Sequence, residues 1–489
     1  MTGPRWSHVL LGLCALALTA ALVRVAVHDP TDQPVSGDQA SFTYQALSLL
    51  GGDLAYDASD QERWIDLGWQ DQPSGLFVQQ RDDGWAFAKP IGYSVLLAPA
   101  LAIAGARGIS LLGAALLLAY ASCWYGIGRM RWDRATAAAV ATVATVASHA
   151  WFFAFPAHAD LFVAALVGAA ALGAARAASQ PERAATGWMT VAAMASALLV
   201  TEKLPALVAL APLLVVAFVR APMRARLVAM AVGAVVLVVS VTPYLFYSDG
   251  ASWSAYGGDR FYAIATTPWS GGRDTDLTPW RTRDALTPAF VFDAIAHPSD
   301  ELPSATLTYA VGRHTGVATF LPIVPALTGA AIVGWWHRRK HPDGQHPDDQ
   351  RPDGQRHDDR DHAIALAAAG GLLAYVGLYI VVFTDNYFGG GQSVGNRYFL
   401  QVSLLVAVAA MAGGVTARHA RWCAGAAAMW AVVVLGPQLW HADDAFYRIE
   451  RSSPAQRLLP FDGSQTDAWR FQCEPIDCVA PPLQSYGDD

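Results

Sequence analysis

The sequence has little charge. Only 15% of its 489 residues are Asp, Glu, Lys or Arg, and 54% are hydrophobic, whereas a soluble globular protein usually carries about 25% charged residues. Charge is nearly absent from long windows at 135–157, 184–201, 204–219, 227–248, 363–383, 398–417 and 422–440. Several of them approach the ~20 apolar residues that cross a bilayer. This composition excludes an ordinary soluble domain and predicts a polytopic membrane protein.

The chain also has no excess of basic residues and few cysteines. Its formal net charge is −7, and no basic patch suggests a nucleic-acid partner. Three of the five cysteines lie in or near apolar segments, where a buried thiol is ordinary. The other two, Cys473 and Cys478, lie in the polar C-terminal tail and could pair if that compartment is oxidising.

Short loops indicate which side of the membrane is which, because their Lys and Arg stay on the cytoplasmic side. One alternating set of loops contains ten Arg, and the other contains two basic residues. The basic set comprises 129–134, 176–183, 220–226 and 418–421, and the other set comprises 153–160, 201–203 and 384–397. We therefore place the basic set inside. The N-terminal segment 8–27 could be a signal peptide, but in so apolar a chain we interpret it as an uncleaved anchor.

This orientation constrains the apolar segment 91–105. If it spanned, every later loop would lie on the wrong side, so we interpret it as a helix at the outer surface. We then expect an all-α polytopic protein of about eleven transmembrane helices, N-terminus inside and C-terminus outside, with juxtamembrane helices in the first outer loop. The expected spans are 8–27, 108–128, 134–152, 160–177, 185–200, 204–221, 226–247, 309–336, 363–383, 398–416 and 421–437.

These spans form one transmembrane module, 1–437, followed by a short extracytoplasmic tail, 438–489. The module contains a first outer loop at 28–107, a large outer loop at 248–308 and a cytoplasmic loop at 337–362. Within the cytoplasmic loop, degenerate five-residue units rich in Asp, Pro, Gly and His cannot build a core, so we expect disorder there. Its histidines leave metal binding as the alternative.

The stretch SGDQASFTYQALSLLGGDL follows the first anchor. Ser36 and Gln39 fit a capping box, which places Asp38 in the first turn of an amphipathic helix on the membrane surface. The helix dipole alone favours a carboxylate there by ~0.3–1 kcal/mol. The local pattern therefore fits both a helix-start residue and an ionised catalytic base.

Further polar groups occur at the outer ends of the expected spans. His158 and Asp160 begin one span, and an acid at membrane depth is costly unless it faces protein or water. Glu202 and Lys203 share a very short loop, where they could pair, snorkel or hold an anion. Lys89 precedes the surface helix, where a lysine either anchors the helix or binds phosphate as a point charge.

The loop 385–397 has three consecutive glycines and a Gly-Asn turn before Arg397. Glycines permit close backbone approach, and arginine with loop amides suits phosphate binding. A flexible hairpin between helices is the alternative. Because all these groups are expected on one face, they suit a reaction in which cations hold a phosphate leaving group and a base activates a hydroxyl.

With these residues in place, the chain resembles the integral-membrane glycosyltransferases of the C superfamily. That class includes protein O-mannosyltransferases, lipid A aminoarabinose transferases and oligosaccharyltransferase catalytic subunits. The stretch around Asp38 resembles a bacterial motif in which GDE, a tyrosine and SLL..GDL recur, with Gln39 in place of the usual glutamate. AKPIGYS resembles the KPP.YY segment, FPAHAD resembles the second acidic motif, and GGGQSVGNRYFLQ resembles the GG.S.G.RY loop.

The resemblance implies that Asp38 is the general base, that Asp160 is a second site acid and that Lys89 contacts the donor phosphate. We expect Arg397 and Lys203 to bind that phosphate as well. The expected substrate-binding residues are Tyr44, Tyr93, His158, Asp385, Asn396 and Tyr398, together with Arg260 and Tyr262 of the large outer loop. A cap packed over the site is the alternative role for that loop.

The resemblance further implies a polyprenyl-phosphate sugar as donor and inverting transfer to a hydroxyl of a glycan, lipid or protein at the outer face of the bacterial cytoplasmic membrane. No cofactor is expected. Oligosaccharyltransferases use a metal ion, but none is expected here, because 153–162 has no DxD-type pair of acids. A transporter or flippase of lipid-linked sugars is the main alternative. Transporters often have internal repeats and binding sites near the bilayer midplane. In this chain the charged groups are expected at one surface of the membrane. A glycan polymerase or ligase of another fold is a third possibility.

Overall fold

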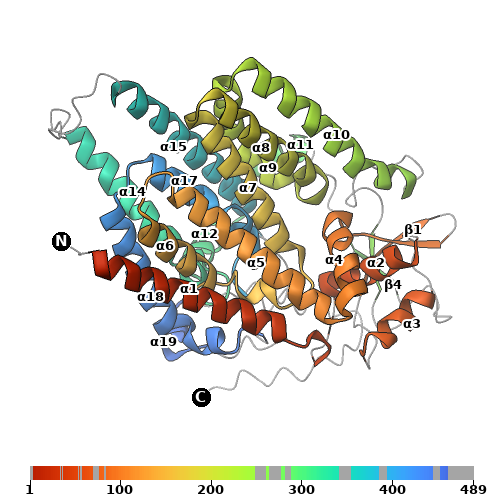
Figure 1. Ribbon diagram of the computed structural model, residues 1–489. Coiled ribbons are helices and arrows are strands. Elements are labelled where there is room, and N and C mark those ends of the chain that lie inside the picture. Colours follow the sequence, from red (N-terminus) through yellow and green to blue (C-terminus); the bar gives the residue numbers. More distant parts are fainter. Residues whose placement is uncertain are drawn as a thin grey trace.

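The computed structural model describes residues 4–32, 35, 37–52, 54, 58–69, 76–81, 84–247, 260–263, 277–280, 288–340, 354–384, 394–443 and 452–460. Long helices form a bundle, and the strands gather at one end of it with the short helices between residues 37 and 104, on the right in Figure 1. The long helices are α1 (Pro4–Val27), α5 (Arg107–Gly128), α7 (Ala159–Ser179), α8 (Glu182–Glu202), α10 (Met223–Tyr247), α15 (Gly354–Gly377) and α18 (Ala417–Trp440).

Seven helices in the described part of the chain, these same seven, are long and apolar enough to cross a membrane. The helical, polytopic fold class is therefore confirmed. Four further apolar helices are shorter: α4 (Ile91–Ala104), α6 (Arg134–Val146), α9 (Leu204–Arg220) and α14 (Ile323–Lys340). The remaining helices and helical turns are η1 (Pro30–Asp32), α2 (Gly37–Gly51), α3 (Ala58–Asp66), η2 (Phe152–Ala154), α11 (Pro288–Ala296), α12 (Leu302–Val311), α13 (Val317–Phe320), η4 (Leu378–Val382), α16 (Arg397–Val402), α17 (Leu404–Ala412) and α19 (Pro454–Arg457).

Two expected spans are broken. The segment 309–336 is divided among α12, α13 and α14, because Gly312 ends α12 and Pro322 lies between α13 and α14. The segment 398–416 is divided into α16 and α17 at Ser403, whose hydroxyl donates to the Leu400 carbonyl at 2.8 Å and meets the Tyr120 hydroxyl at 2.8 Å. The hydropathy of a sequence indicates how long an apolar stretch is, but not where the helix within it is broken.

Helix α7 lies in the centre of the bundle. It is rich in Ala and Gly, most of its residues are buried, and it contacts α5, α8, α9 and α16. Small residues allow membrane helices to approach closely, and Gly173 of α7 lies against the backbone of Trp188 and Ala192 in α8. This packing holds the N-terminus of α7, with Asp160, in the interior of the protein.

The first outer loop that the sequence predicts, 28–107, leaves the bundle and returns to it at the same end. It is called the first outer segment below. The Ser110 hydroxyl, near the start of α5, donates to the His28 carbonyl at 2.9 Å, just after α1. Between them, α4 has 14 residues, about 21 Å at 1.5 Å per residue, which is less than the ~30 Å hydrocarbon thickness. It packs on α2 and α5. Short helices are therefore present where the juxtamembrane helices were expected, and their position at the membrane surface stays a prediction.

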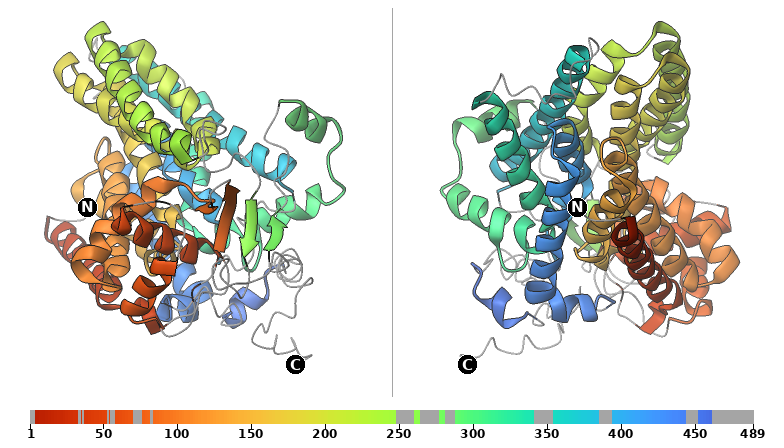
Figure 2. Two further views of the ribbon diagram at one scale, coloured as in Figure 1. Left: turned by 90° about the vertical axis from the view of Figure 1, so that its right-hand side faces the viewer. Right: turned by 60° about the vertical axis from the view of Figure 1, so that its left-hand side comes forward.

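A small antiparallel sheet, which was not predicted, is added to the helical fold. Its strands lie in the order β2-β1-β3-β4, with β1 (Leu76–Arg81), β2 (Gly84–Phe87), β3 (Arg260–Ala263) and β4 (Leu277–Trp280). Phe77 of β1 pairs with Tyr262 of β3, so the sheet joins the first outer segment to the large outer loop (Figure 2). Pairing between segments so distant in sequence leaves no local signal.

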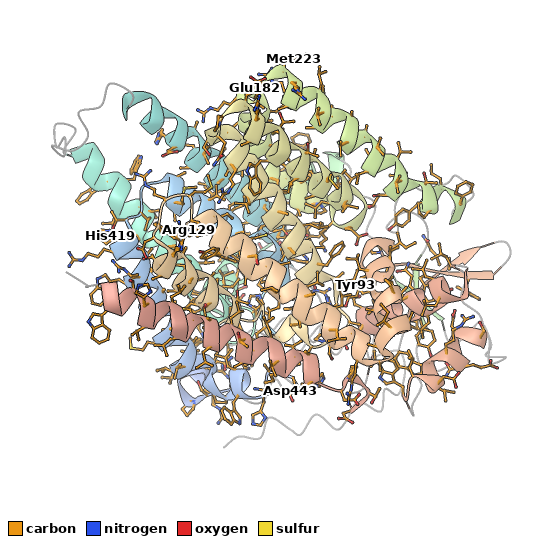
Figure 3. The ribbon with its side chains drawn as sticks, viewed as in Figure 1. Tyr93, Arg129, Glu182, Met223, His419 and Asp443 are labelled. Atoms are coloured by element: carbon orange, nitrogen blue, oxygen red, sulfur yellow. The ribbon has the colours of Figure 1, made fainter. Side chains whose placement is uncertain are left out.

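The two ends of the bundle differ in chemistry. Figure 3 labels Arg129, Glu182, Met223 and His419, which lie in or beside the four basic loops, and all are displaced from Tyr93 toward the other end. The basic loops thus gather opposite the short helices and the sheet. The side of the membrane that each end faces stays a prediction.

Candidate functional site

Asp38 is the centre of a charged cluster at the end of the bundle that carries the sheet. Its Oδ1 forms an ion pair with Lys89 Nζ, and its Oδ2 accepts a hydrogen bond from Arg397 Nη1 at 2.9 Å and lies 3.6 Å from His158 Nε2. The preceding Gly37 has a φ of 56°, a conformation that favours glycine. The structure thus brings together four residues that the sequence analysis selected from separate loops.

The surroundings of Asp38 keep it ionised. Burial by itself raises the pKa of this carboxyl, but Lys89, Arg397 and His158 together hold the pKa well below its usual range. The side chain is still 18% exposed. Asp38 is therefore a paired carboxylate with some access from outside, which a simple helix-start residue would not need.

Asp160, the predicted second acid, belongs to the same cluster. Its Oδ2 lies 2.7 Å from His158 Nδ1 and 3.7 Å from Arg397 Nη1. Gln401 Nε2 donates a hydrogen bond to its Oδ1. The side chain is buried, 8% exposed. A buried charge must be paired to be tolerated, and Asp160 meets that condition through Arg397.

The start of α16 orients Arg397. Asn396 Oδ1 accepts from the Phe399 amide at 2.9 Å and caps the helix. The Gly395 amide donates to the His314 carbonyl at 2.7 Å, and Gly395 has a φ of 77°. Asn396 Oδ1 thus serves the helix cap and helps to direct Arg397, and the role of Asn396 as a substrate ligand stays a prediction.

The start of α4 positions Lys89. The Lys89 carbonyl accepts from Gln45 Nε2 at 3.1 Å, and the Lys89 ammonium lies 3.8 Å from the centre of the Phe77 ring. The next amides are held from other helices, because the Ile91 amide donates to the Tyr244 hydroxyl at 2.6 Å and the Gly92 amide to Glu202 Oε1 at 2.7 Å. Glu202 therefore caps α4.

Lys203 lies at the edge of the cluster. Its ammonium lies 4.1 Å from the centre of the Tyr398 ring, and its charge acts on Asp160. Within the described residues it forms no ion pair shorter than 4.0 Å, so the pairing with Glu202 considered in the sequence analysis does not occur. Tyr398 thus contacts this lysine through its ring, and its role as a substrate ligand stays a prediction.

The two predicted tyrosines of the first outer segment are buried packing residues. Tyr44 donates to Gln61 Oε1 at 2.8 Å and stacks on Trp64 with ring centres 4.9 Å apart, on the side of α2 that contacts α3. Tyr93 is 1% exposed, and its hydroxyl is hydrogen-bonded to the His158 backbone. Tyr93 therefore acts on the site through His158, whereas Tyr44 supports α3.

Several predictions concern residues outside those described: Ser36, Asp385, the glycines 389–391, the part of the repeats at 341–353, and the pair Cys473 and Cys478. At both ends of the loop 337–362 the expectation of disorder is wrong, because α14 continues to Lys340 and α15 begins at Gly354. Arg260 and Tyr262 lie on β3, whose backbone pairs with β1, but their side chains are outside the described part. The backbone placement brings the large outer loop beside Phe77 and thus near Lys89.

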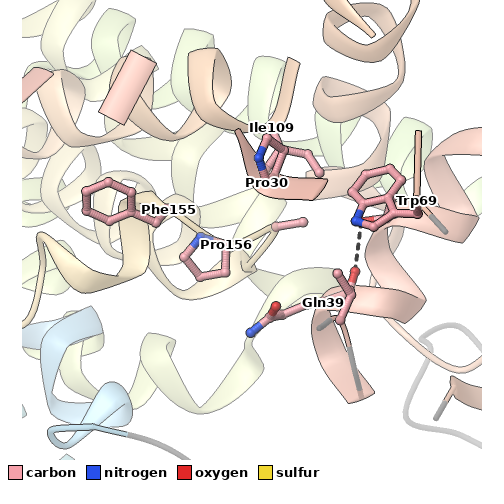
Figure 4. Close-up of a pocket in the computed structure, with 9 residues that line it drawn as sticks. Pro30, Gln39, Trp69, Ile109, Phe155 and Pro156 are labelled. Carbon is pink, nitrogen blue, oxygen red and sulfur yellow. Dashed lines mark hydrogen bonds between the residues drawn. The ribbon is translucent and has the colours of Figure 1, made fainter. Parts of the chain in front are cut away.

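A small pocket lies beside the first turns of α2. Figure 4 shows Gln39 facing it, opposite Trp69, Phe155 and Pro156. Gln39, which stands where the GDE motif has a glutamate, thus lines a pocket next to Asp38 that also contains Trp69 and Phe155. Among the described residues no group of three His, Cys, Asp or Glu side chains is arranged to hold a metal ion, and the expectation of a metal-free site stays a prediction.

Sequence reasoning missed two contributors to this cluster, Gln401 and Gln45, and for a third, Glu202, it missed the contact with the start of α4. Gln401 lies four residues after Arg397 on one helix face, and that spacing could have indicated it. Gln45 and Glu202 act on the backbone at the start of α4, from α2 and α8. No local pattern identifies such contacts, because the partners are separated by 44 and 110 residues.

No protein-family model matches the chain, and no curated protein matches it. Two solved structures align with it: ArnT from Cupriavidus metallidurans bound to undecaprenyl phosphate, and the same protein in the apo state. In each case the identity is 16% and the TM-score is 0.40, with 84% of this chain and 60% of the ArnT chain covered. The chain thus spans about three fifths of the length of the solved structures it resembles.

Proposed function

We propose that the chain is a membrane-embedded glycosyltransferase. It moves a sugar from a polyprenyl-phosphate donor to an acceptor hydroxyl of a glycan, lipid or protein. The reaction takes place at the outer face of the bacterial cytoplasmic membrane. The observation that carries the proposal is the ionised Asp38 carboxylate, held between Lys89 and Arg397 where several apolar helices begin or end.

The charges of the cluster suit a phosphodiester. Its two carboxylates, Asp38 and Asp160, face three cations, Lys89, Arg397 and Lys203. These five side chains sum to +1, which offsets the single negative charge of a lipid-phosphate sugar. When the bond to the sugar breaks, the phosphate gains a second charge, and preorganised cations stabilise that change.

The carboxylate supplies the other half of the reaction. An acceptor hydroxyl that donates to Asp38 is oriented toward the sugar carbon. The hydroxyl oxygen forms the new bond to that carbon, while the phosphate leaves from the opposite side with the bonding electrons. This geometry inverts the configuration of the sugar. The polyprenyl tail of the donor would lie along the apolar helices next to the cluster.

The test is a transfer assay with the purified protein in lipid nanodiscs. The donors are a panel of radiolabelled polyprenyl-phosphate sugars, and bacterial membrane extract supplies acceptors. Wild type is expected to transfer at least one sugar, and Asp38→Asn is expected to lose about 10²–10⁴-fold in rate, the usual contribution of a positioned base.

Asp133→Asn is the matched control. Asp133 caps α6 by accepting from the Thr136 amide at 3.0 Å, and asparagine is an equally good cap. This variant should retain full activity. Equal transfer by Asp38→Asn and wild type would reduce Asp38 to a helix-start residue. If no donor on the panel is consumed, but lipid-linked sugar is moved across vesicle membranes, the chain is a flippase.

A further inference from the structure

His149 is a buried histidine that the proposed reaction does not use directly. It lies in the turn between α6 and η2, and its side chain is fully buried, so a substrate has no direct access to its ring. A polar ring removed from water needs partners inside the protein, because burial without them costs free energy. The partners of this ring therefore indicate what it holds.

Both ring nitrogens of His149 face backbone carbonyl oxygens of other segments. Nδ1 lies 3.2 Å from the carbonyl oxygen of Phe320, the last residue of α13, and Nε2 lies 3.2 Å from that of Asn396, the N-cap of α16. The His149 amide also donates to the Phe320 carbonyl, at 3.1 Å. A neutral ring has one N–H and donates to one of these carbonyls at a time, whereas a protonated ring donates to both. In both states the ring lies between α13 and the start of α16.

The same ring determines which residue can precede Asn396. A Cβ at position 395 would lie 2.6 Å from Cγ of His149, which is much closer than unbonded carbon atoms approach. Gly395 also has a φ of 77°, a conformation that favours glycine. The last glycine of the loop before Arg397 is therefore required both by its backbone conformation and by the histidine ring packed against it.

Helix α16 is too short to fix its own direction. It has six residues, and a helix of that length gains little stability from its own hydrogen bonds, so its position depends on contacts from outside. Arg397 is its first residue, and the carbonyls on both sides of Arg397 have such contacts. The Asn396 carbonyl meets the His149 ring, and the Tyr398 carbonyl accepts from the Tyr375 hydroxyl at 3.1 Å.

The direction of Arg397 matters because its guanidinium has little room. The side chain is 16% exposed, and its Nη1 lies 2.9 Å from Asp38 Oδ2 and 3.7 Å from Asp160 Oδ2. A small rotation of the start of α16 would move this nitrogen away from both carboxylates. It would also move the guanidinium away from the place where the donor phosphate is expected.

We propose that His149 is a positioning residue for the proposed sugar transfer, on which this inference rests. By holding the Asn396 carbonyl and filling the space beside Gly395, it directs Arg397 toward Asp38 and the donor phosphate. Without the ring, the guanidinium would bind the phosphate less tightly. It would also stabilise less well the charge that the phosphate gains as the sugar leaves. Donor affinity and transfer rate should therefore fall together.

The test compares two His149 variants with a matched control in lipid nanodiscs. His149→Phe keeps a ring but lacks both nitrogens, and His149→Gln keeps one donor and one acceptor. Trp132→Phe is the control, because it also removes a buried N–H bond, from Trp132 Nε1 to the Val415 carbonyl at 2.8 Å, beside a basic loop. Two quantities are measured: the affinity for polyprenyl phosphate without a sugar, and kcat/KM with the donor that wild type uses.

We expect His149→Phe to weaken the binding of polyprenyl phosphate about tenfold, as for the loss of a hydrogen bond to a charged group. Its kcat/KM should fall about 10²-fold, the cost of a misplacement of about 1 Å. His149→Gln should lie between His149→Phe and wild type. Trp132→Phe should match wild type in both quantities, and thermal unfolding verifies that each variant is folded.

A double-mutant cycle with Arg397→Gln separates positioning from general damage. If His149 acts through the guanidinium, adding His149→Phe to Arg397→Gln should change either quantity by less than about twofold. An equal loss with and without the arginine overturns the proposal, as does a folded His149→Phe with normal affinity and kcat/KM. A loss of equal size in Trp132→Phe also overturns it. If His149→Phe does not fold, the same cycle with His149→Gln decides.

The two measurements distinguish this inference from the proposed function. A wild type that binds polyprenyl phosphate but transfers no sugar from any donor overturns the proposed function, and the affinities of the variants then decide the role of His149. A wild type that does not bind polyprenyl phosphate overturns both proposals.

Discussion

At the scale of single residues, the site depends on charges that are buried together. Removing one member of a buried ion pair leaves the other uncompensated, which costs more than the pair itself contributes. Asp38 has cations on both oxygens, and Asp160 has one cation and one amide. The three lysines of the whole chain are Lys89, Lys203 and Lys340, so two of them lie in or beside this cluster.

The lowered pKa of Asp38 makes part of the stability depend on pH. A carboxyl whose pKa is lower in the folded state stabilises the protein above its ordinary pKa, about 3.9. That contribution is lost as the pH falls through the folded-state value. We therefore expect the Tm of wild type, relative to the Tm of Asp38→Asn, to fall as the pH is lowered from 6 to 3.

Differential scanning fluorimetry of the two purified proteins measures this difference. Other acids titrate equally in both proteins and cancel. A difference in Tm that stays constant over the whole range would contradict the lowered pKa of Asp38 and the pairing that causes it.

At the scale of elements, the N-terminus of α4 is held by two other helices. The first amides of a helix have no partner inside it, and here the Tyr244 hydroxyl of α10 and the Glu202 carboxylate of α8 accept from Ile91 and Gly92. The Tyr93 amide also meets Glu202. Because Lys89 lies two residues before this helix, the contacts determine where its ammonium can reach.

Loss of this cap should weaken donor binding. We expect Glu202→Ala to raise the KM for donor about tenfold and to lower stability by about 1–3 kcal/mol, the usual cost of an unpaired buried donor. Glu202→Gln keeps an acceptor oxygen and should lie between Ala and wild type. Tyr244→Phe removes one acceptor and should have a smaller effect. Donor titrations and unfolding in detergent measure both quantities, and an unchanged KM in Glu202→Ala would show that α4 is positioned by packing alone.

At the scale of the whole molecule, the cluster and the basic loops lie at opposite ends of the bundle (Figures 1 and 3). Positive loops remain in the cytoplasm, so the cluster is expected to face outward. A donor with its phosphate at that surface would meet Lys89 and Arg397 without crossing the bilayer.

Cysteine labelling in intact cells tests this orientation. In a background with the native cysteines replaced, Leu458→Cys should react with a membrane-impermeant maleimide, because Leu458 is 87% exposed and follows the last span. Arg183→Cys lies in an exposed position of a basic loop and should react only after the membrane is permeabilised. The reverse pattern would place the cluster in the cytoplasm.

The sequence by itself determined the membrane class, the grouping of the loops and the candidate positions at the helix ends. These are local properties, because hydropathy, loop charge and a residue's place at a helix start are read over a few neighbours. Asp38, Lys89, Asp160 and Arg397 were all found in this way. The order and spacing of the helices then made it reasonable to place them together.

Only the tertiary structure decided which of those groups meet and what each contacts. Asp38 and Arg397 are 359 residues apart, and their contact depends on where the packing of α16 on α7 places the start of α16 relative to α2. The same packing turned Glu202 from a partner of Lys203 into a cap of α4, assigned Tyr44 to α3 and paired β1 with β3. Contacts of this kind depend on the shapes of many surfaces at once, which no short stretch of sequence records.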